Sequence, residues 1–83
     1  PNPFNPKVSF SFNIINPSIV GLNIYDLTGR KVKSINKSFY QSGACQMNWN
    51  AKSENGNLVS AGAYIYELVI NQKIKRGKIV YLK

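Results

Sequence analysis

Few residues of this chain have the chemistry that catalysis or metal binding requires. The sequence contains no histidine, a single cysteine, Cys45, and only three acidic residues, Asp26, Glu54 and Glu67. The chain therefore lacks the commonest general base and metal ligand, and Cys45 has no imidazole to activate it. These counts leave a Ser–Lys pair open, but no signature for one is present. We expect a protein that is not an enzyme and has no catalytic residue, metal or cofactor.

The two remaining candidates for chemistry also favour a structural interpretation. Cys45 alternates with Met47 and Trp49, so we expect it to be a small buried hydrophobe rather than a reactive thiol. A single cysteine forms no internal disulfide, which fits both the cytosol and secreted bacterial proteins. The turn at Ser53–Asn57 offers only the carboxylate of Glu54, which is too little for a calcium site.

Positive charge is the strongest compositional signal. Eleven Lys and Arg against three Asp and Glu give a net charge of +8, and the final residues are rich in basic side chains: Lys73, Lys75, Arg76, Lys78 and Lys83. Such a run can attract phosphate, anionic lipid or an acidic protein surface. It can equally protect an exposed edge strand from aggregation. We favour the edge strand and expect no nucleic-acid partner, because no aromatic stacking platform interleaves with the charges.

The elements that hold these residues have the alternating pattern of β-strands. Apolar and polar residues alternate clearly from residue 7 to residue 14, with a break at Pro17. Further strands are expected at 19–25, 31–35, 43–49, 63–70 and 73–82, with turns at 26–30, 53–57 and 71–72 and with Gly77 as a possible bulge. Residues 36–42 are predicted to be a polar link, with at most a single helical turn near 37–40.

This spacing predicts an all-β chain, an immunoglobulin-like antiparallel β-sandwich of about seven short strands. At 83 residues the chain is one domain, and Trp49 is expected to anchor its thin core. No stretch is apolar enough to form an integral membrane segment. The chain opens at Pro1 without a signal peptide, so we interpret residues 1–83 as a fragment of a larger secreted protein.

Four blocks in this order and spacing form a more specific pattern. They are the opening Pro-Asn-Pro-Phe-Asn-Pro at 1–6, Ile-Tyr-Asp-Leu-Thr-Gly-Arg-Lys-Val at 24–32, Gly-Ala-Tyr at 62–64, and a basic final strand that ends on Lys83. Phe4 is expected to plug one end of the sandwich. Over essentially its whole length the chain resembles the C-terminal sorting domain, type A, of proteins exported by the type IX secretion system.

The resemblance implies recognition rather than a reaction. Such a domain directs a cargo protein from the periplasm through an outer-membrane translocon to the cell surface or the medium, and a sortase-like protease usually removes it. The implied partners are the type IX secretion translocon, that protease and a parent cargo domain upstream. The implied recognition residues are Gly29, Gly62, Tyr64, Lys75, Lys78 and Lys83.

Two alternatives stay open. Residues 49–66, with Glu54-Asn55-Gly56-Asn57 between Trp49 and Tyr66, are also similar to the immunoglobulin-like domain of flagellar hook-capping proteins, which implies a structural module. That family lacks the proline-rich opening and the basic last strand. The other alternative is an accessory binding domain of a secreted enzyme, with a sugar platform made of exposed aromatic residues: Tyr25, Phe39, Tyr40 or Tyr81.

Overall fold

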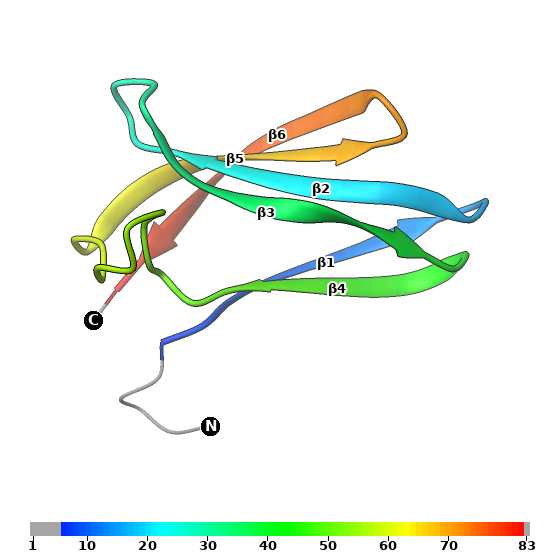
Figure 1. Ribbon diagram of the computed structural model, residues 1–83, viewed down its shortest axis with the longest axis horizontal. Helices are drawn as coiled ribbons and strands as arrows, with labels where there is room; N and C mark the ends of the chain where they lie inside the picture. Colours follow the sequence, from blue (N-terminus) through cyan, green and yellow to red (C-terminus); the bar gives the residue numbers. More distant parts are fainter. Residues whose placement is uncertain (1–5, 83) are drawn as a thin grey trace.

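The computed structural model describes residues 6–82 and has two antiparallel sheets (Figure 1). The small sheet pairs β1 with β4, and the large sheet has the strand order β3-β2-β5-β6. The six strands are β1 Val8–Ile14, β2 Ser18–Tyr25, β3 Lys31–Tyr40, β4 Gly43–Trp49, β5 Gly62–Ile70 and β6 Lys73–Tyr81. Figure 1 shows the large sheet above the small one, so the two layers form the predicted sandwich.

The core lies between the two sheets because alternate residues of each strand point inward. On β2, Val20, Leu22 and Ile24 are fully buried, while their neighbours in the strand face the outer side. Trp49 on β4 is fully buried as well, so its predicted role as the anchor of the core is confirmed. The other buried members of the core come from β1, β4, β5 and β6 and from the loop that follows β4: Phe10, Met47, Ala51, Tyr64, Leu68 and Tyr81.

The predicted polar link at 36–42 is wrong. β3 continues to Tyr40, and only Gln41 and Ser42 separate it from β4. Neither a link nor a helical turn forms here, because β3 pairs with β2 along its whole length, through Ile19 with Phe39 and Ser18 with Tyr40. The register shifts between Val20 and Leu22, and the pairing of β3 with β2 then continues on the other side of the shift.

The predicted bulge at Gly77 is also wrong. β5 and β6 pair without a register shift, and Gly77 lies directly opposite Tyr66. A Cβ atom at residue 77 would come within 2.5 Å of the Tyr66 ring. Glycine is therefore needed at this position to leave room for the aromatic ring. In place of a seventh strand, the described residues contain an isolated β-bridge between Lys52 and Leu58.

The hairpin between β5 and β6 holds a strained residue. Asn71 and Gln72 form its turn with φ angles of 52° and 85°, the positive values of a type I′ turn. Asparagine tolerates this conformation, but glutamine does not favour it. Gln72→Gly should therefore raise the free energy of unfolding by about 1 kcal/mol, measured by thermal denaturation. Gln46→Gly, on the exposed side of β4, is the contrasting control and should lower the free energy of unfolding. If both variants were less stable than the wild-type chain, Gln72 would not be strained.

Candidate recognition surfaces

Gly29 lies in the tight turn between β2 and β3, which is organised by Asp26. The Asp26 carboxylate oxygen Oδ1 accepts hydrogen bonds from the Thr28 and Arg30 amides at 2.9 and 3.0 Å and from the Thr28 hydroxyl at 2.6 Å. Gly29 has a φ of 90°, which the turn requires and which glycine adopts freely. Arg30 also lies 3.8 Å from the Asp26 carboxylate, across the turn. The role of Gly29 in this structure is therefore to close a turn.

Gly62 and Tyr64 begin β5 at the same end of the sandwich. Gly62 has a φ of 148°, and an added Cβ would meet no other atom, so its glycine character serves the backbone conformation rather than a close approach. The Tyr64 hydroxyl donates a 2.6 Å hydrogen bond to the Ser60 carbonyl four residues upstream. This is the tyrosine corner of immunoglobulin-like sandwiches. Burial, followed by the nearby Asp26 carboxylate, raises the pKa of Tyr64 and keeps the hydroxyl protonated as a donor.

The tyrosine corner is joined to the buried tryptophan. The rings of Tyr64 and Trp49 meet edge to face, with centroids 5.6 Å apart. The indole Nε1 of Trp49 donates a 2.9 Å hydrogen bond to the Lys52 carbonyl, so both aromatic polar atoms are satisfied. The two residues therefore fix the loop between β4 and β5 at both of its ends.

The predicted basic residues on β6 do not form a single site. Lys75 pairs with Leu68, whose side chain is buried in the core, whereas Lys78 pairs with Ile65, two residues from the outward-facing Glu67. The two lysines therefore point to opposite sides of the large sheet, although both are exposed. The other predicted recognition residue of this set, Lys83, and the predicted plug, Phe4, lie outside the described residues.

A row of polar side chains crosses the outer face of the large sheet, which sequence reasoning missed. Asn23 accepts a 2.7 Å hydrogen bond from the Ser34 hydroxyl and donates one of 3.1 Å to Glu67. Arg76 completes the row, with both Nε and a terminal nitrogen 3.0 Å from Glu67 Oε2. The direct register of these residues on four neighbouring strands brings them together.

This row makes stability depend on pH. The hydrogen bond from Asn23, followed by the interactions with Arg76, lowers the pKa of Glu67 below its ordinary value of 4.5. A lowered pKa in the folded state means that Glu67 stabilises the fold fully above that value, and that this contribution is lost as the pH falls. The pKa values of Glu54 and Asp26 are lowered too, by the Ser34 amide and the Thr28 hydroxyl respectively.

Glu67→Gln is accordingly expected to melt below the wild-type chain at pH 7. The difference between their melting temperatures should shrink as the pH falls from 5 to 2, because wild-type Glu67 then becomes protonated and neutral like the glutamine. Thermal melts across this pH range measure it. Lys52→Gln changes a lysine that forms no ion pair within residues 6–82, and its difference from wild type should stay constant. A constant difference for Glu67→Gln would contradict the lowered pKa.

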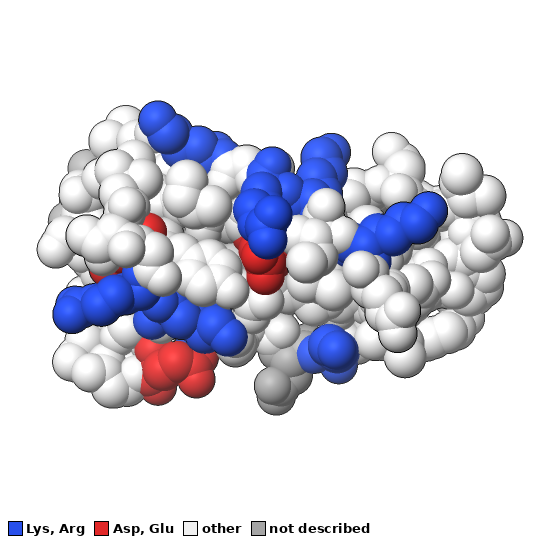
Figure 2. All heavy atoms as spheres, turned by 90° about the horizontal axis from the view of Figure 1, so that it is seen from above, with Lys and Arg blue, Asp and Glu red and all other residues white. Residues whose placement is uncertain are grey.

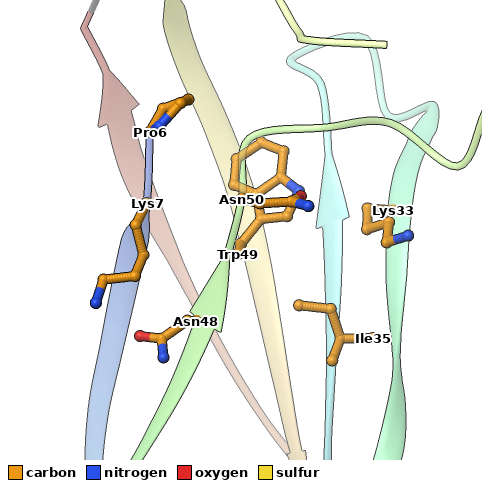
Figure 3. A pocket seen from close by; sticks show the side chains of 7 residues that line it. All are labelled: Pro6, Lys7, Lys33, Ile35, Asn48, Trp49 and Asn50. Atoms are coloured by element: carbon orange, nitrogen blue, oxygen red, sulfur yellow. The ribbon is translucent and has the colours of Figure 1, made fainter. Parts of the chain in front are cut away.

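A groove of about 350 Å³ opens beside β4, next to the inner face of β3 (Figure 3). In Figure 3, Trp49 and Ile35 lie between the strands, with Lys7 and Lys33 on either side. Its lining offers no carboxylate, thiol or imidazole: Pro6, Lys7, Lys33, Ile35, Asn48, Trp49 and Asn50. Lys33 is already paired with Glu54 at 3.7 Å. The groove therefore contains no set of residues for acid–base or nucleophilic catalysis.

The four aromatic residues considered for a sugar platform do not lie together. Tyr81 is buried, and Tyr40 packs edge to face on Phe12 at 5.5 Å. Phe39 is 63% exposed on the outer face of β3, and the Tyr25 hydroxyl on that face donates a 3.4 Å hydrogen bond to Glu67. Cys45 is half-buried, with its thiol directed at the Gln41 and Gly43 carbonyls. Within residues 6–82, no helix is long and apolar enough to cross a membrane.

Comparison with known proteins supports one of the predicted resemblances. The model of the FlgD Ig-like domain family matches residues 6–73. The crystal structure of FlgD from P. aeruginosa has a TM-score of 0.70 and 29% sequence identity over 92% of this chain. The present chain spans 59% of that FlgD chain. A search of curated proteins found no match.

These findings confirm the fold and the similarity to the hook-capping domain, and they give no support to the type IX sorting domain. The family is one of immunoglobulin-like domains. The matching region runs from residue 6 to Lys73, the first residue of β6, and covers most of the sandwich. The chain therefore belongs to the FlgD Ig-like domain family.

Proposed function

We propose that this chain is a non-catalytic structural module of a larger protein, as in flagellar hook-capping proteins. The observation that carries the proposal is the family match over residues 6–73. The chemistry of the chain agrees with it, because each side-chain carboxylate forms an ion pair: Asp26 with Arg30, Glu54 with Lys33 and Glu67 with Arg76. The role of such a module is to fold independently and to hold neighbouring parts of its parent.

A fusion experiment tests this proposal. The chain is joined to the C-terminus of a periplasmic reporter enzyme in a bacterium that has type IX secretion. A purely structural module should leave the reporter active and inside the periplasm, and proteases should degrade the fused chain no faster than the isolated chain. Rapid degradation of the fused chain, or release of the reporter from the cell, would contradict it.

A second candidate function is a sorting signal for type IX secretion, which takes a cargo protein through the periplasm to the cell surface or the medium. The observation that favours it is the position of β6. This strand begins at Lys73, where the family match ends, and it carries exposed lysines at Lys75 and Lys78. The family resemblance therefore does not account for the most basic strand of the chain.

The same fusion distinguishes the two functions. Export of the reporter, and its loss when Val80–Lys83 is deleted, would support the sorting signal. Lys75→Gln with Lys78→Gln should then reduce export more than Lys7→Gln with Lys52→Gln, which removes the same charge from outside β6. Export that is unaffected by the deletion would exclude the last strand as the recognised element.

A further inference from the structure

The outer face of the large sheet has basic residues on its edge strands and apolar residues on either side of the polar row of Asn23 and Glu67. Along the middle strands, Tyr25 pairs with Ile65, and Gly21 pairs with Val69. The edge strand β3 contributes Lys31, opposite Tyr25, and Lys37, whose Cγ would lie 3.0 Å from a Cβ added to Gly21. The other edge strand, β6, contributes basic side chains in line with the middle strands; we call this surface the basic face, and its cations are Lys31, Lys37, Arg76 and Lys78.

Most of the positive charge of the basic face is not balanced by ion pairs within residues 6–82. Figure 2 looks onto this side of the molecule and shows Lys and Arg side chains spread across it, with few acidic ones. Glu67, in the middle, is already engaged by Arg76. Among the described residues, Lys31, Lys37 and Lys78 form no ion pair. Lys37 and Lys78 are thus available to an external anion, as is Lys31, whose charge also lowers the pKa of the Glu54 carboxyl.

Exposed apolar side chains lie among these cations. Ile19 and Phe39 pair at one end of the face, with 51% and 63% of their surface exposed. Ile74, opposite Val69, and Val80, opposite Ala63, are 51% and 61% exposed. Two shallow hollows of about 370 and 210 Å³ flank Lys37 and are both lined by Val69. The face is therefore open and shallow, and it exposes apolar groups beside its charges.

The other side of the sandwich has a different character. The strands of the small sheet, Val8–Ile14 and Gly43–Trp49, contain no charged residue. Their outer surface carries a neutral network in which Ser9 and Gln46 both donate to the Asn48 side chain at 3.0 Å. An extended anionic surface would consequently attract the sandwich in one orientation, with the basic face toward it.

We propose that the basic face docks on an anionic phospholipid surface. Its free cations are lysines, compact charges on flexible stems that suit mobile phosphate groups, whereas Arg76, whose planar fork would recognise a fixed carboxylate, is occupied by Glu67. The exposed apolar side chains can enter the headgroup layer between the lysines. A shaped acidic protein partner would be expected to meet a deeper pocket with a free arginine at its centre.

Co-sedimentation with lipid vesicles tests the proposal. The 83-residue chain should bind vesicles of equal parts phosphatidylcholine and phosphatidylglycerol, should not bind pure phosphatidylcholine, and should dissociate as salt is added. Each lysine near an anionic surface contributes roughly fivefold in affinity, so the triple variant Lys31→Gln, Lys37→Gln, Lys78→Gln should bind roughly a hundredfold more weakly.

The control removes the same charge elsewhere. Lys7→Gln, Lys52→Gln, Lys75→Gln leaves the basic face intact, because Lys75 pairs with the buried Leu68 on the opposite side, and it should keep most of the affinity. Thermal melts establish that both triple variants are folded. Equal losses of vesicle affinity in the two variants would show that only the net charge matters, and this would overturn the proposal. Binding to polyglutamate as tight as that to the vesicles would assign the face to an acidic protein and overturn it too.

Discussion

Replacing Trp49 with alanine is expected to lower the free energy of unfolding by about 3–5 kcal/mol. Trp49 is fully buried, contacts the Tyr64 ring and donates a hydrogen bond to the Lys52 carbonyl. The substitution removes the largest apolar group of a thin core and leaves a cavity. Because domains of this size are only marginally stable, such a loss is a large share of the total. Urea denaturation followed by circular dichroism measures it.

Two further variants show which property of Trp49 matters. Trp49→Phe keeps an aromatic ring in the core but loses the indole donor, so its loss should be clearly smaller than that of alanine. Phe39→Ala removes an aromatic ring that is 63% exposed and should change stability by no more than about 0.5 kcal/mol. If Trp49→Ala behaved like Phe39→Ala, Trp49 would not be the anchor of this core.

The second large effect is expected at Tyr64, where the ring and the hydroxyl can be separated. Tyr64→Ala should cost about 3–5 kcal/mol, as for other buried aromatic residues. Tyr64→Phe keeps the ring on Trp49 but removes the donor to the Ser60 carbonyl, which should cost about 1 kcal/mol. Chemical denaturation of the purified variants provides both values.

The matched control is Tyr40→Phe. Tyr40 is half-buried against Phe12, and its hydroxyl forms no hydrogen bond within residues 6–82, so the free energy of unfolding should hardly change. Equal and negligible effects of Tyr64→Phe and Tyr40→Phe would show that the tyrosine corner does not stabilise the loop. The Gly-Ala-Tyr block at 62–64 would then have to serve a purpose other than stabilising the fold.

Much of the fold could be predicted because its strands alternate so regularly. The alternating pattern in 7–14, 19–25 and 63–70 predicts strands that the structure contains, and Val20, Leu22 and Ile24, which alternate along one of them, are all buried. The second half of β3 was missed, since residues 36–40 are mostly polar and only their pairing with β2 makes them a strand. The geometry of Gly77 depends on the Tyr66 ring across the sheet, which the local sequence does not show.

The candidate sites were less predictable for a related reason. The predicted link at 36–42 left Lys37 outside any strand. The basic face, to which Lys37 belongs, therefore could not be predicted from the sequence. The row of polar side chains around Glu67 depends on the register between strands that are far apart in the sequence. The spacing of these residues along the chain does not indicate that they meet. By contrast, the Asp26 turn is local, and its hydrogen bonds could be predicted from the residues themselves.

We expect the 83-residue chain to fold on its own as one immunoglobulin-like module. Urea unfolding of the purified chain, followed in parallel by fluorescence and far-ultraviolet circular dichroism, tests it most directly. Trp49 is the only tryptophan, so fluorescence reports on the core alone while dichroism reports on both sheets. One cooperative transition with coincident midpoints is expected. Separate midpoints, or a gradual change without a transition, would contradict it.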